Sequence, residues 1–433
     1  MSESNPPEPV STNDDAPLVR PKRTLRKRFL IGLGLLFALV LGYNAFRSWQ
    51  AGAQFESRLE KLREQGVALT LDGLQIERLA EDDNAQTWMR RAQPHTEALN
   101  KLLIDYQRSD ECEALRPTAE QIKVLEEAFE EHADAFVLYA KAAGCKGFQS
   151  DWRIGDRPSE SLGVNLEDSQ EARSIMRHCS SRAGLLMSQG DFDEALQLGL
   201  QMLTFSRLAE HQPMVLGYLV GIACRSMSIE VIVAVLERAS LTDEQREKID
   251  QALGECESVS SFRHALASER IYGLAAFRSE IFGGPVQSMV MSTFKLDACD
   301  YVDLIGQMDD WAARPRHSIA DELSILAEQE WGVLTKMVAP ALIQVRYVHD
   351  RALARVRCAR LLNALQNHFP DGIPEQPVLS ELSNTEDFWL DPFTGKPLNV
   401  RVTAEDIVVY SVGSNGTDEG GRLDDQEDQG IRI

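Results

Sequence analysis

The sequence predicts a mainly α-helical protein with an N-terminal single transmembrane helix, an extracytoplasmic helical domain and a small α/β C-terminal module, a helix plus an antiparallel hairpin. Three observations predict it. Six basic residues directly precede an uncharged apolar segment at residues 29–46. Helix start signals recur between residues 54 and 367, where strand-like alternation is rare. Two short strand-like runs follow, between residues 398 and 412.

Residues 1–28 are expected to form a disordered cytoplasmic tail that ends in a basic flank. Residues 1–19 are polar, acidic and rich in proline, whereas residues 20–28 carry six positive charges. Residues 29–46 follow as eighteen uncharged residues, and a helix of that length covers ~27 Å of the ~30 Å hydrocarbon core of a bilayer. Because basic flanks stay on the cytoplasmic side, we predict a signal anchor in the cytoplasmic membrane, with the N-terminus inside and the bulk of the chain periplasmic.

A cleaved secretory signal is the alternative, because Ala51-Gly52-Ala53 matches the small-residue rule for a cleavage site. The region before the apolar core is longer than in a typical secretory signal, and Arg47 and Trp49 lie between that core and the candidate site. These features favour an uncleaved anchor that contacts the lipid bilayer through residues 29–46.

Composition narrows the class of partner. The 433 residues include 45 Lys plus Arg and 67 Asp plus Glu, which gives a formal net charge of −22. Such an acidic chain repels phosphate backbones, so we expect no nucleic-acid partner. Seven cysteines without a C-x-x-C pair exclude a zinc ribbon and a thioredoxin-type redox site.

Residues 54–340 are predicted to form the extracytoplasmic helical domain. Two capping boxes mark helix starts, Thr118-Ala119-Glu120-Gln121 and Thr242-Asp243-Glu244-Gln245, and Ser318-Ile319-Ala320-Asp321 is a weaker third. Residues 180–203 resemble half of a tetratricopeptide unit. No 34-residue period recurs, so we expect an ordinary antiparallel helix pair there.

Residues 214–236 are apolar enough to invite a second transmembrane assignment. Arg225 and Glu230 interrupt the stretch and leave uncharged runs too short to span a bilayer. We therefore predict a central core helix that is buried on nearly all sides. Gly217 and Gly221 would then allow close approach of a neighbouring helix.

Residues 341–413 are predicted to form the C-terminal module. Its helix runs from about Ala341 to Asn367, with apolar residues in one stripe at helical spacing. Four basic residues of this helix are expected mostly to face away from the stripe: Arg346, Arg351, Arg355 and Arg360. We expect them to pair with acidic helices of the same chain, and a ligand-binding patch is the less favoured alternative.

The chain changes character after the break Pro370-Asp371-Gly372. The runs Leu398–Val402 and Ile407–Val412 predict a small antiparallel hairpin, with a short turn between them. Residues 414–433 are expected to be an acidic tail, and such tails are usually solvated.

Three turn motifs follow one another near the C-terminus: Asp391-Pro392-Phe393-x-Gly395-Lys396-Pro397, then Tyr410-Ser411-Val412-Gly413-x-Asn415-Gly416, then Gly420-Gly421. With the preceding helix and the acidic end, they resemble the globular part of the major pseudopilins of type II secretion. The resemblance implies a helix packed on a small sheet, a calcium-binding loop near the end, and an envelope or secretion-assembly protein as partner. The prepilin cleavage signature is missing and the anchor lies about 300 residues upstream, so the chain is not expected to be a pseudopilin subunit. The layout is also similar to uncharacterised bacterial envelope proteins that join an anchor, a helical domain and this ending.

Calcium is the one cofactor that the resemblance implies, and otherwise no cofactor is expected. The candidate ligands are Asn415, Asp418, Asp424 and Asp425, whose oxygen atoms are of the hard type that calcium prefers. Glu419, Glu427 and Asp428 offer further carboxylates nearby. The spacing does not fit the EF-hand rule, and a solvated acidic tail is the alternative.

The sequence contains no recognisable catalytic constellation. Its eight histidines are scattered and none forms H-E-x-x-H, while Ser292-x-x-Lys295 lacks the companion K-T-G motif. Cys112 and Cys145 flank one predicted helix, but the sequence leaves their pairing open.

We therefore expect a membrane-anchored extracytoplasmic binding or scaffold protein. Its contact element is expected at residues 371–433, the part of the C-terminal module after its helix together with the acidic tail. The alternative is an envelope enzyme whose active site is assembled from dispersed carboxylates and histidines of the helical domain. In a third reading, the ending is a folding cap for the long helix and has no partner.

Overall fold

The structure is a computed structural model that describes residues 23–70, 72–74, 77–104, 114–150, 158–278, 287–379, 382, 388–423 and 428–433. Only the backbone is described at 23–26, 72, 158–162, 164, 278 and 287–293. The helices are α1 (Arg23–Glu64), α2 (Ala85–Leu102), α4 (Ala119–Glu131), α5 (Ala133–Ala143), α6 (Pro158–Gln189), α7 (Phe192–Glu210), α8 (Met214–Arg238), α9 (Asp243–Gly254), α10 (Ser260–Arg278), α11 (Gln287–Trp311), α12 (Ala320–Glu328) and α13 (Val333–His368). The strands are β1 (Asn399–Val402), β2 (Ile407–Ser411) and β3 (Gln429–Arg432).

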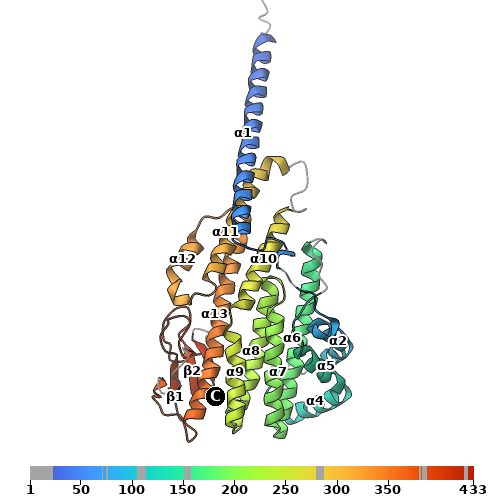
Figure 1. Ribbon diagram of the computed structural model, residues 1–433, viewed down its shortest axis with the longest axis vertical. Helices are drawn as coiled ribbons and strands as arrows, with labels where there is room; N and C mark the ends of the chain where they lie inside the picture. The colour runs from blue at the N-terminus through green and yellow to red at the C-terminus, as the bar shows by residue number, and fades with distance from the viewer. Residues whose placement is uncertain are drawn as a thin grey trace, which may run out of the picture.

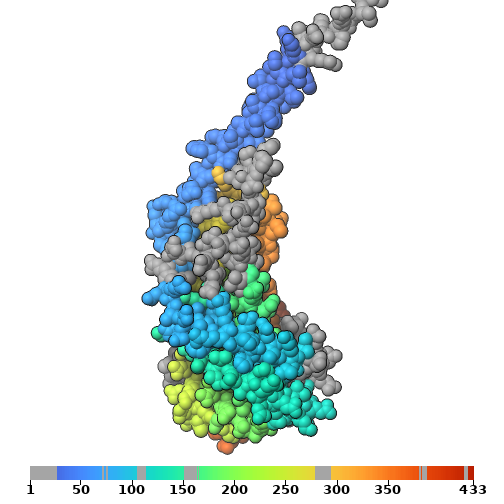
Figure 2. All heavy atoms as spheres, turned by 90° about the vertical axis from the view of Figure 1, so that its right-hand side faces the viewer, coloured from blue at the N-terminus to red at the C-terminus, as the bar shows by residue number. Residues whose placement is uncertain are grey.

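The predicted anchor is the upper part of α1, a single helix of 42 residues. From Phe29 to Trp49 its large apolar side chains are exposed, and this part stands clear of the body (Figures 1 and 2). Its lower part joins the body, where Phe55 and Leu59 are buried in a cluster with side chains of α10 and α11. The α1 helix is therefore long and apolar enough to cross a membrane, and it continues without a break into the folded body.

The second apolar helix, α8, is a core helix, as the sequence predicts. Of its most apolar window, 67% is buried inside the protein. It makes its most extensive contact with α7. A Cβ on Gly221 would lie 2.5 Å from the backbone nitrogen of Glu210, the last residue of α7, and one on Gly217 would lie 2.6 Å from the Cβ of Gln212 in the connection between the two helices. Gly221 thus permits the predicted close approach of a neighbouring helix, whereas Gly217 makes room for the connection.

The neighbouring helices α6 and α7 form the predicted antiparallel pair. Only two residues, Gly190 and Asp191, separate them, and such a short connection reverses the chain direction. Gly190 has a φ of +88°, a backbone conformation that glycine adopts without steric cost.

Two of the three predicted helix starts are confirmed. Thr118 caps α4 and Thr242 caps α9, each in a complete capping box with the glutamine three residues later. The third prediction is wrong, because α12 begins at Ala320 after Ile319, without a side-chain cap. The Ser318 hydroxyl instead donates to the carbonyl oxygen of Pro315 at 2.8 Å, which closes a short 3₁₀ turn.

The last long helix, α13, begins at Val333 rather than at Ala341 and carries Pro340 inside it. Two carboxylates of α11 explain the early start. Asp297 accepts from the backbone N–H groups of Leu334 at 2.6 Å and Thr335 at 2.9 Å, and Asp300 accepts from that of Gly332 at 2.9 Å. These acceptors satisfy N–H groups that have no partner within the helix, and they favour the positive end of its dipole.

The predicted hairpin is confirmed as β1 and β2, which pair antiparallel with Val400 opposite Val409. A third strand, β3, pairs antiparallel with β2 and places Ile431 opposite Val409. Part of the expected acidic tail is therefore a strand of the sheet. The sheet packs on α13 at the end of the body opposite α1 (Figure 1).

The turn before β1 is fixed by a buried carboxylate. Asp391 is 2% exposed and accepts from the Phe393 backbone N–H at 2.8 Å, the Ser411 hydroxyl at 2.9 Å and the Val412 backbone N–H at 3.2 Å. The Asp-Pro-Phe-x-Gly turn thus holds the end of β2. Cys145 is a free thiol, whereas Cys112 lies outside the described residues.

Candidate functional site: a basic cleft between α8, α13 and β3

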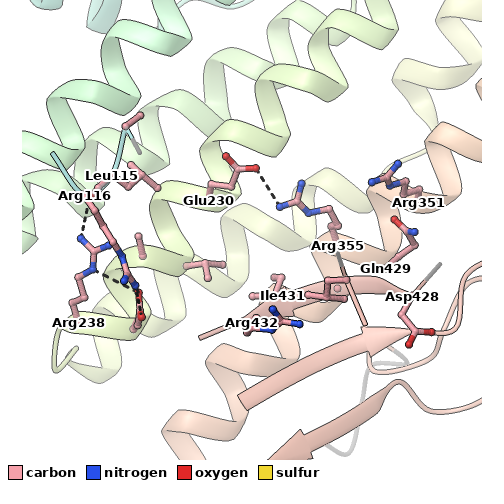
Figure 3. A pocket seen from close by; sticks show the side chains of 16 residues that line it. Leu115, Arg116, Glu230, Arg238, Arg351, Arg355, Asp428, Gln429, Ile431 and Arg432 are labelled. Carbon is pink, nitrogen blue, oxygen red and sulfur yellow. Dashed lines mark hydrogen bonds and ion pairs between the residues drawn. The ribbon is translucent and has the colours of Figure 1, made fainter. Parts of the chain in front are cut away.

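A cleft of about 590 Å³ lies where the C-terminal sheet meets the helical body (Figure 3). This volume falls within the range of small-molecule sites. Three of its walls are α8, α13 and β3, and residues just before α4 complete it. Its charged lining consists of Arg116, Glu230, Glu237, Arg238, Arg351, Arg355, Asp428 and Arg432.

Helical spacing explains why these side chains share the cleft. Glu230, Val233, Ala234 and Glu237 recur three and four residues apart, which places them on one face of α8. Arg351 and Arg355 are likewise four residues apart on α13. On β3, Gly430 permits tight strand pairing, because a Cβ there would lie 2.3 Å from the carbonyl oxygen of Val409.

The cleft carries an excess of positive charge in an acidic protein. Among the described residues, five arginines and three carboxylates line it, a difference of two charges, whereas the chain as a whole has a formal net charge of −22. The carboxylate of Glu237 accepts from Arg116 Nη2 at 2.7 and 2.9 Å and lies 3.6 Å from Arg238 Nε. Arg238 also donates to the carbonyl oxygen of Leu115 at 2.9 Å. One end of the cleft is thus internally paired.

The other end of the cleft, around Arg351 and Arg355, is only partly paired among the described residues. Arg355 donates to the Ser226 hydroxyl and contacts Glu230 at 3.4 Å, while its Nε is buried without a partner among the described residues. Arg351 has no hydrogen bond or ion pair within the part of the chain that the structure describes. A guanidinium stays charged at any pH that a folded protein meets. Arg351 is therefore a cation of the cleft lining that has no anionic partner among the described residues.

The expectation for the four arginines of this helix is confirmed in part. Arg355 pairs with Glu230 of α8, and Arg360 pairs with Asp250 of α9 and with Glu257. Arg346 pairs with Asp350 of its own helix. Arg346 and Arg360 are 2% and 5% exposed, so they lie in the core instead of facing away from it.

A smaller apolar hollow of about 220 Å³ adjoins the cleft along the seam between α8 and α13. Arg351 and Arg355 line both spaces, so the two meet at these side chains. The rest of the hollow is mainly aliphatic: Leu219, Ile222, Ala223 and Ile229 of α8, and Val348 and Ala352 of α13.

The predicted calcium ligands are only partly described. Asn415 and Asp418 lie in the loop after β2, and Asp424 and Asp425 lie outside the described residues. Asn415 accepts from the Thr417 backbone N–H at 3.0 Å, and Asp418 accepts from the Tyr410 hydroxyl at 2.9 Å. Within the described ranges, no group of three or more His, Cys, Asp and Glu side chains is placed to hold a metal ion.

Two other carboxylates of this loop do interact. The Oδ2 atom of Asp428 accepts from the Gly421 backbone N–H at 2.8 Å, and Asp428 is 1% exposed. Its Oδ1 and the Oε2 of Glu419 are both buried without partners among the described residues. Burial, together with the adjacent Glu419 carboxyl, raises the pKa of Asp428. Sequence spacing does not single out this pair, because the two residues are nine positions apart in an acidic stretch.

The histidines lie elsewhere. His349 is buried, and its Nδ1 lies 2.6 Å from the Tyr218 hydroxyl, while the neighbouring Asp350 points to Arg346. No histidine is among the described residues that line the cleft or the hollow. No family model, curated protein or solved structure matches the chain.

Proposed function

We propose that this chain is a single-pass protein of the cytoplasmic membrane whose extracytoplasmic body binds an anionic partner in the basic cleft. The observation that carries the proposal is Arg351, a cation without a partner among the described residues, in a cleft whose two glutamates are already paired with arginines. The C-terminal module contributes β3 to the wall, which agrees with its proposed role as contact element. An envelope or secretion-assembly protein that presents a carboxylate or phosphate would fit this surface.

The anchor part of the proposal rests on α1. Ala51, Gly52 and Ala53 lie inside this helix, and Ala51 is 2% exposed. A Cβ on Gly52 would lie 3.1 Å from the Lys295 ammonium nitrogen of α11, so the helix is packed closely there. Proteases cut exposed, flexible segments, and a packed helical site favours an uncleaved anchor. The basic flank supports an N-terminus inside.

The contents of the cleft favour binding over the enzyme alternative. The two glutamates of the lining are each paired with an arginine, Glu237 with Arg116 and Glu230 with Arg355. Asp428 accepts from the backbone N–H of Gly421. This lining is suited to holding a negative charge in place.

Topology is tested on the full-length protein in sealed spheroplasts. External protease should digest the body and leave the tail protected, and purified protein should retain the full 48.4 kDa mass. An N-terminus at Gln54 would show that the segment is a cleaved signal, and a protease-resistant body would place it inside.

Binding is tested in cells with a photo-crosslinking residue at Val233, which lines the cleft. An adduct with a discrete partner should form, and Arg351→Glu should abolish it. Arg173→Glu is the matched control, since it reverses one charge at an exposed position of α6. Absence of any adduct, or equal adducts in both variants, would contradict the proposal.

A further inference from the structure

We infer that the cleft and the adjoining hollow together take one amphiphilic anion, with its carboxylate or phosphate head at Arg351 and Arg355 and a short unbranched apolar chain along the seam between α8 and α13. The inference rests on the proposed function, because it names the ligand class of the same site. Its basis is the junction itself: the two guanidinium groups line both the polar cleft and the apolar hollow.

The head group is specified by the donors at the junction. Within the described part of the chain, Arg351 has no hydrogen bond or ion pair, and the Nε of Arg355 is buried without a partner. The two side chains are one helical turn apart on α13, which lets both contact one anion. Guanidinium groups bind carboxylate and phosphate oxygens through short, charge-assisted hydrogen bonds. Glu230 contacts Arg355 at 3.4 Å and offsets one of the two positive charges. The three side chains together carry one net positive charge, which suits a single anionic head.

The apolar hollow determines what kind of tail the ligand can carry. Ile222 is 8% exposed and Ile229 is 2% exposed, so a ligand there would contact the edge of the core. The polar groups beside it are already engaged: Arg225 pairs with Glu210 and donates to the carbonyl oxygen of Cys256, and the Ser226 hydroxyl accepts from Arg355. An apolar chain would therefore displace water without leaving these groups unpaired.

The position of the site favours a free ligand over a lipid of the surrounding bilayer. The cleft is closed by the C-terminal sheet, which lies at the end of the body opposite α1 (Figure 1). A bilayer lipid would have to leave the membrane completely to reach it. We therefore commit to an amphiphile that arrives from the aqueous phase.

The test uses the full-length protein in nanodiscs of zwitterionic lipid and a series of alkyl phosphates from ethyl to decyl, with inorganic phosphate as the starting point. Empty nanodiscs supply the blank for partitioning into lipid. Calorimetric titration should show one ligand per chain, with the affinity rising about fourfold for each methylene that is buried and then levelling off when the hollow is full. Arg351→Gln should weaken every member of the series by about tenfold or more.

Two further variants separate the parts of the inference. Ala223→Met fills the hollow and should remove the dependence of affinity on the length of the alkyl chain. Arg173→Gln should behave as the unaltered protein. Equal affinity for inorganic and decyl phosphate would overturn the amphiphile inference and leave the anion-binding function intact.

Two further outcomes distinguish the proposal that the cleft binds an anionic partner from the inference that this partner is a free amphiphile. Heat no greater than that of empty nanodiscs for every ligand would overturn the small-ligand inference, and the Val233 adduct would then decide whether the cleft serves a protein partner. A loss of decyl phosphate affinity when anionic lipid is added to the nanodiscs would show that bilayer lipids reach the site, against the commitment to a free ligand.

Discussion

Replacing Gly221 by alanine adds one methyl group at the crossing of α7 and α8. The new Cβ would lie 2.5 Å from the backbone nitrogen of Glu210 and 2.6 Å from its Cα, whereas ordinary contact begins at 3.4 Å. The end of α7 must therefore move by about 0.9 Å, since backbone atoms cannot turn aside as a side chain can.

Three effects of the added methyl group change the free energy of unfolding. Overpacking of a core costs about 1–3 kcal/mol. The movement also disturbs the buried ion pair of Glu210 with Arg225, whose atoms are 3.1 Å apart, and breaking such a pair costs about 3–5 kcal/mol. Alanine regains about 1 kcal/mol of helix propensity. We expect a net loss of about 3 kcal/mol in the free energy of unfolding.

Gly306→Ala is the matched control. Gly306 lies inside α11, and a Cβ there would meet no described heavy atom within 4 Å. The same chemical change should raise stability there by about 0.5–1 kcal/mol. Thermal unfolding of the full-length protein should show Tm lower by about 4 °C for Gly221→Ala and higher by about 1 °C for Gly306→Ala. A Gly221→Ala variant as stable as the unaltered protein would refute the close-packing argument.

Three other predictions follow from the buried polar groups. Asp297→Ala should lower the free energy of unfolding by about 3 kcal/mol, because α13 loses its main cap, whereas Asp300→Ala should cost about 1 kcal/mol; urea titration of both variants checks the order. Burial and nearby arginines lower the pKa of His349 far below 6.5, so the folded state keeps it neutral while the unfolded chain takes up a proton below pH 6.5. The stability contributed by neutral His349 is therefore complete above pH 6.5 and is lost on acidification. The difference in free energy of unfolding between the unaltered protein and His349→Gln should shrink by about 1.4 kcal/mol per pH unit below 6.5. A difference that stays constant with pH would contradict the buried neutral state. Asp428→Asn should raise Tm at pH 7.5, because burial and the facing Glu419 carboxyl raise the pKa of Asp428 and so disfavour its charged form; an unchanged Tm would argue against repulsion at this pair.

The parts of the fold that the sequence predicts correctly depend on local signals. The capping boxes at Thr118 and Thr242 are complete within four residues, so the sequence contains every atom of the interaction. The apolar part of α1 and the charge-interrupted α8 are recognised from length and spacing alone. The hairpin of β1 and β2 has its turn between adjacent strands.

The errors involve partners far away in the chain. The start of α13 is set by Asp297, which is 38 residues before its partner Thr335, and no local pattern reveals that contact. Strand β3 contains one large apolar residue, Ile431, and becomes a strand because the edge of β2 is available to pair with it.

The cleft is the hardest feature to predict. Its ion pairs join Arg116 to Glu237 and Arg355 to Glu230, which are 121 and 125 residues apart. In the sequence, Arg351 is indistinguishable from the other basic residues of its helix. Only the fold shows that its neighbours are paired and that it has no partner among the described residues.

The unbroken α1 helix has a geometric consequence for the whole molecule. A helix advances about 1.5 Å and turns about 100° per residue, and α1 joins the exposed apolar segment to the body without a flexible connection. With that segment in a bilayer, as proposed, the number of residues between Trp49 and Phe55 sets the angle between the cleft and each face of the membrane helix. One inserted residue would rotate the body relative to that helix by about 100° while changing its height by only about 1.5 Å. The length of this short stretch therefore determines which face of the membrane helix lies on the same side as the cleft.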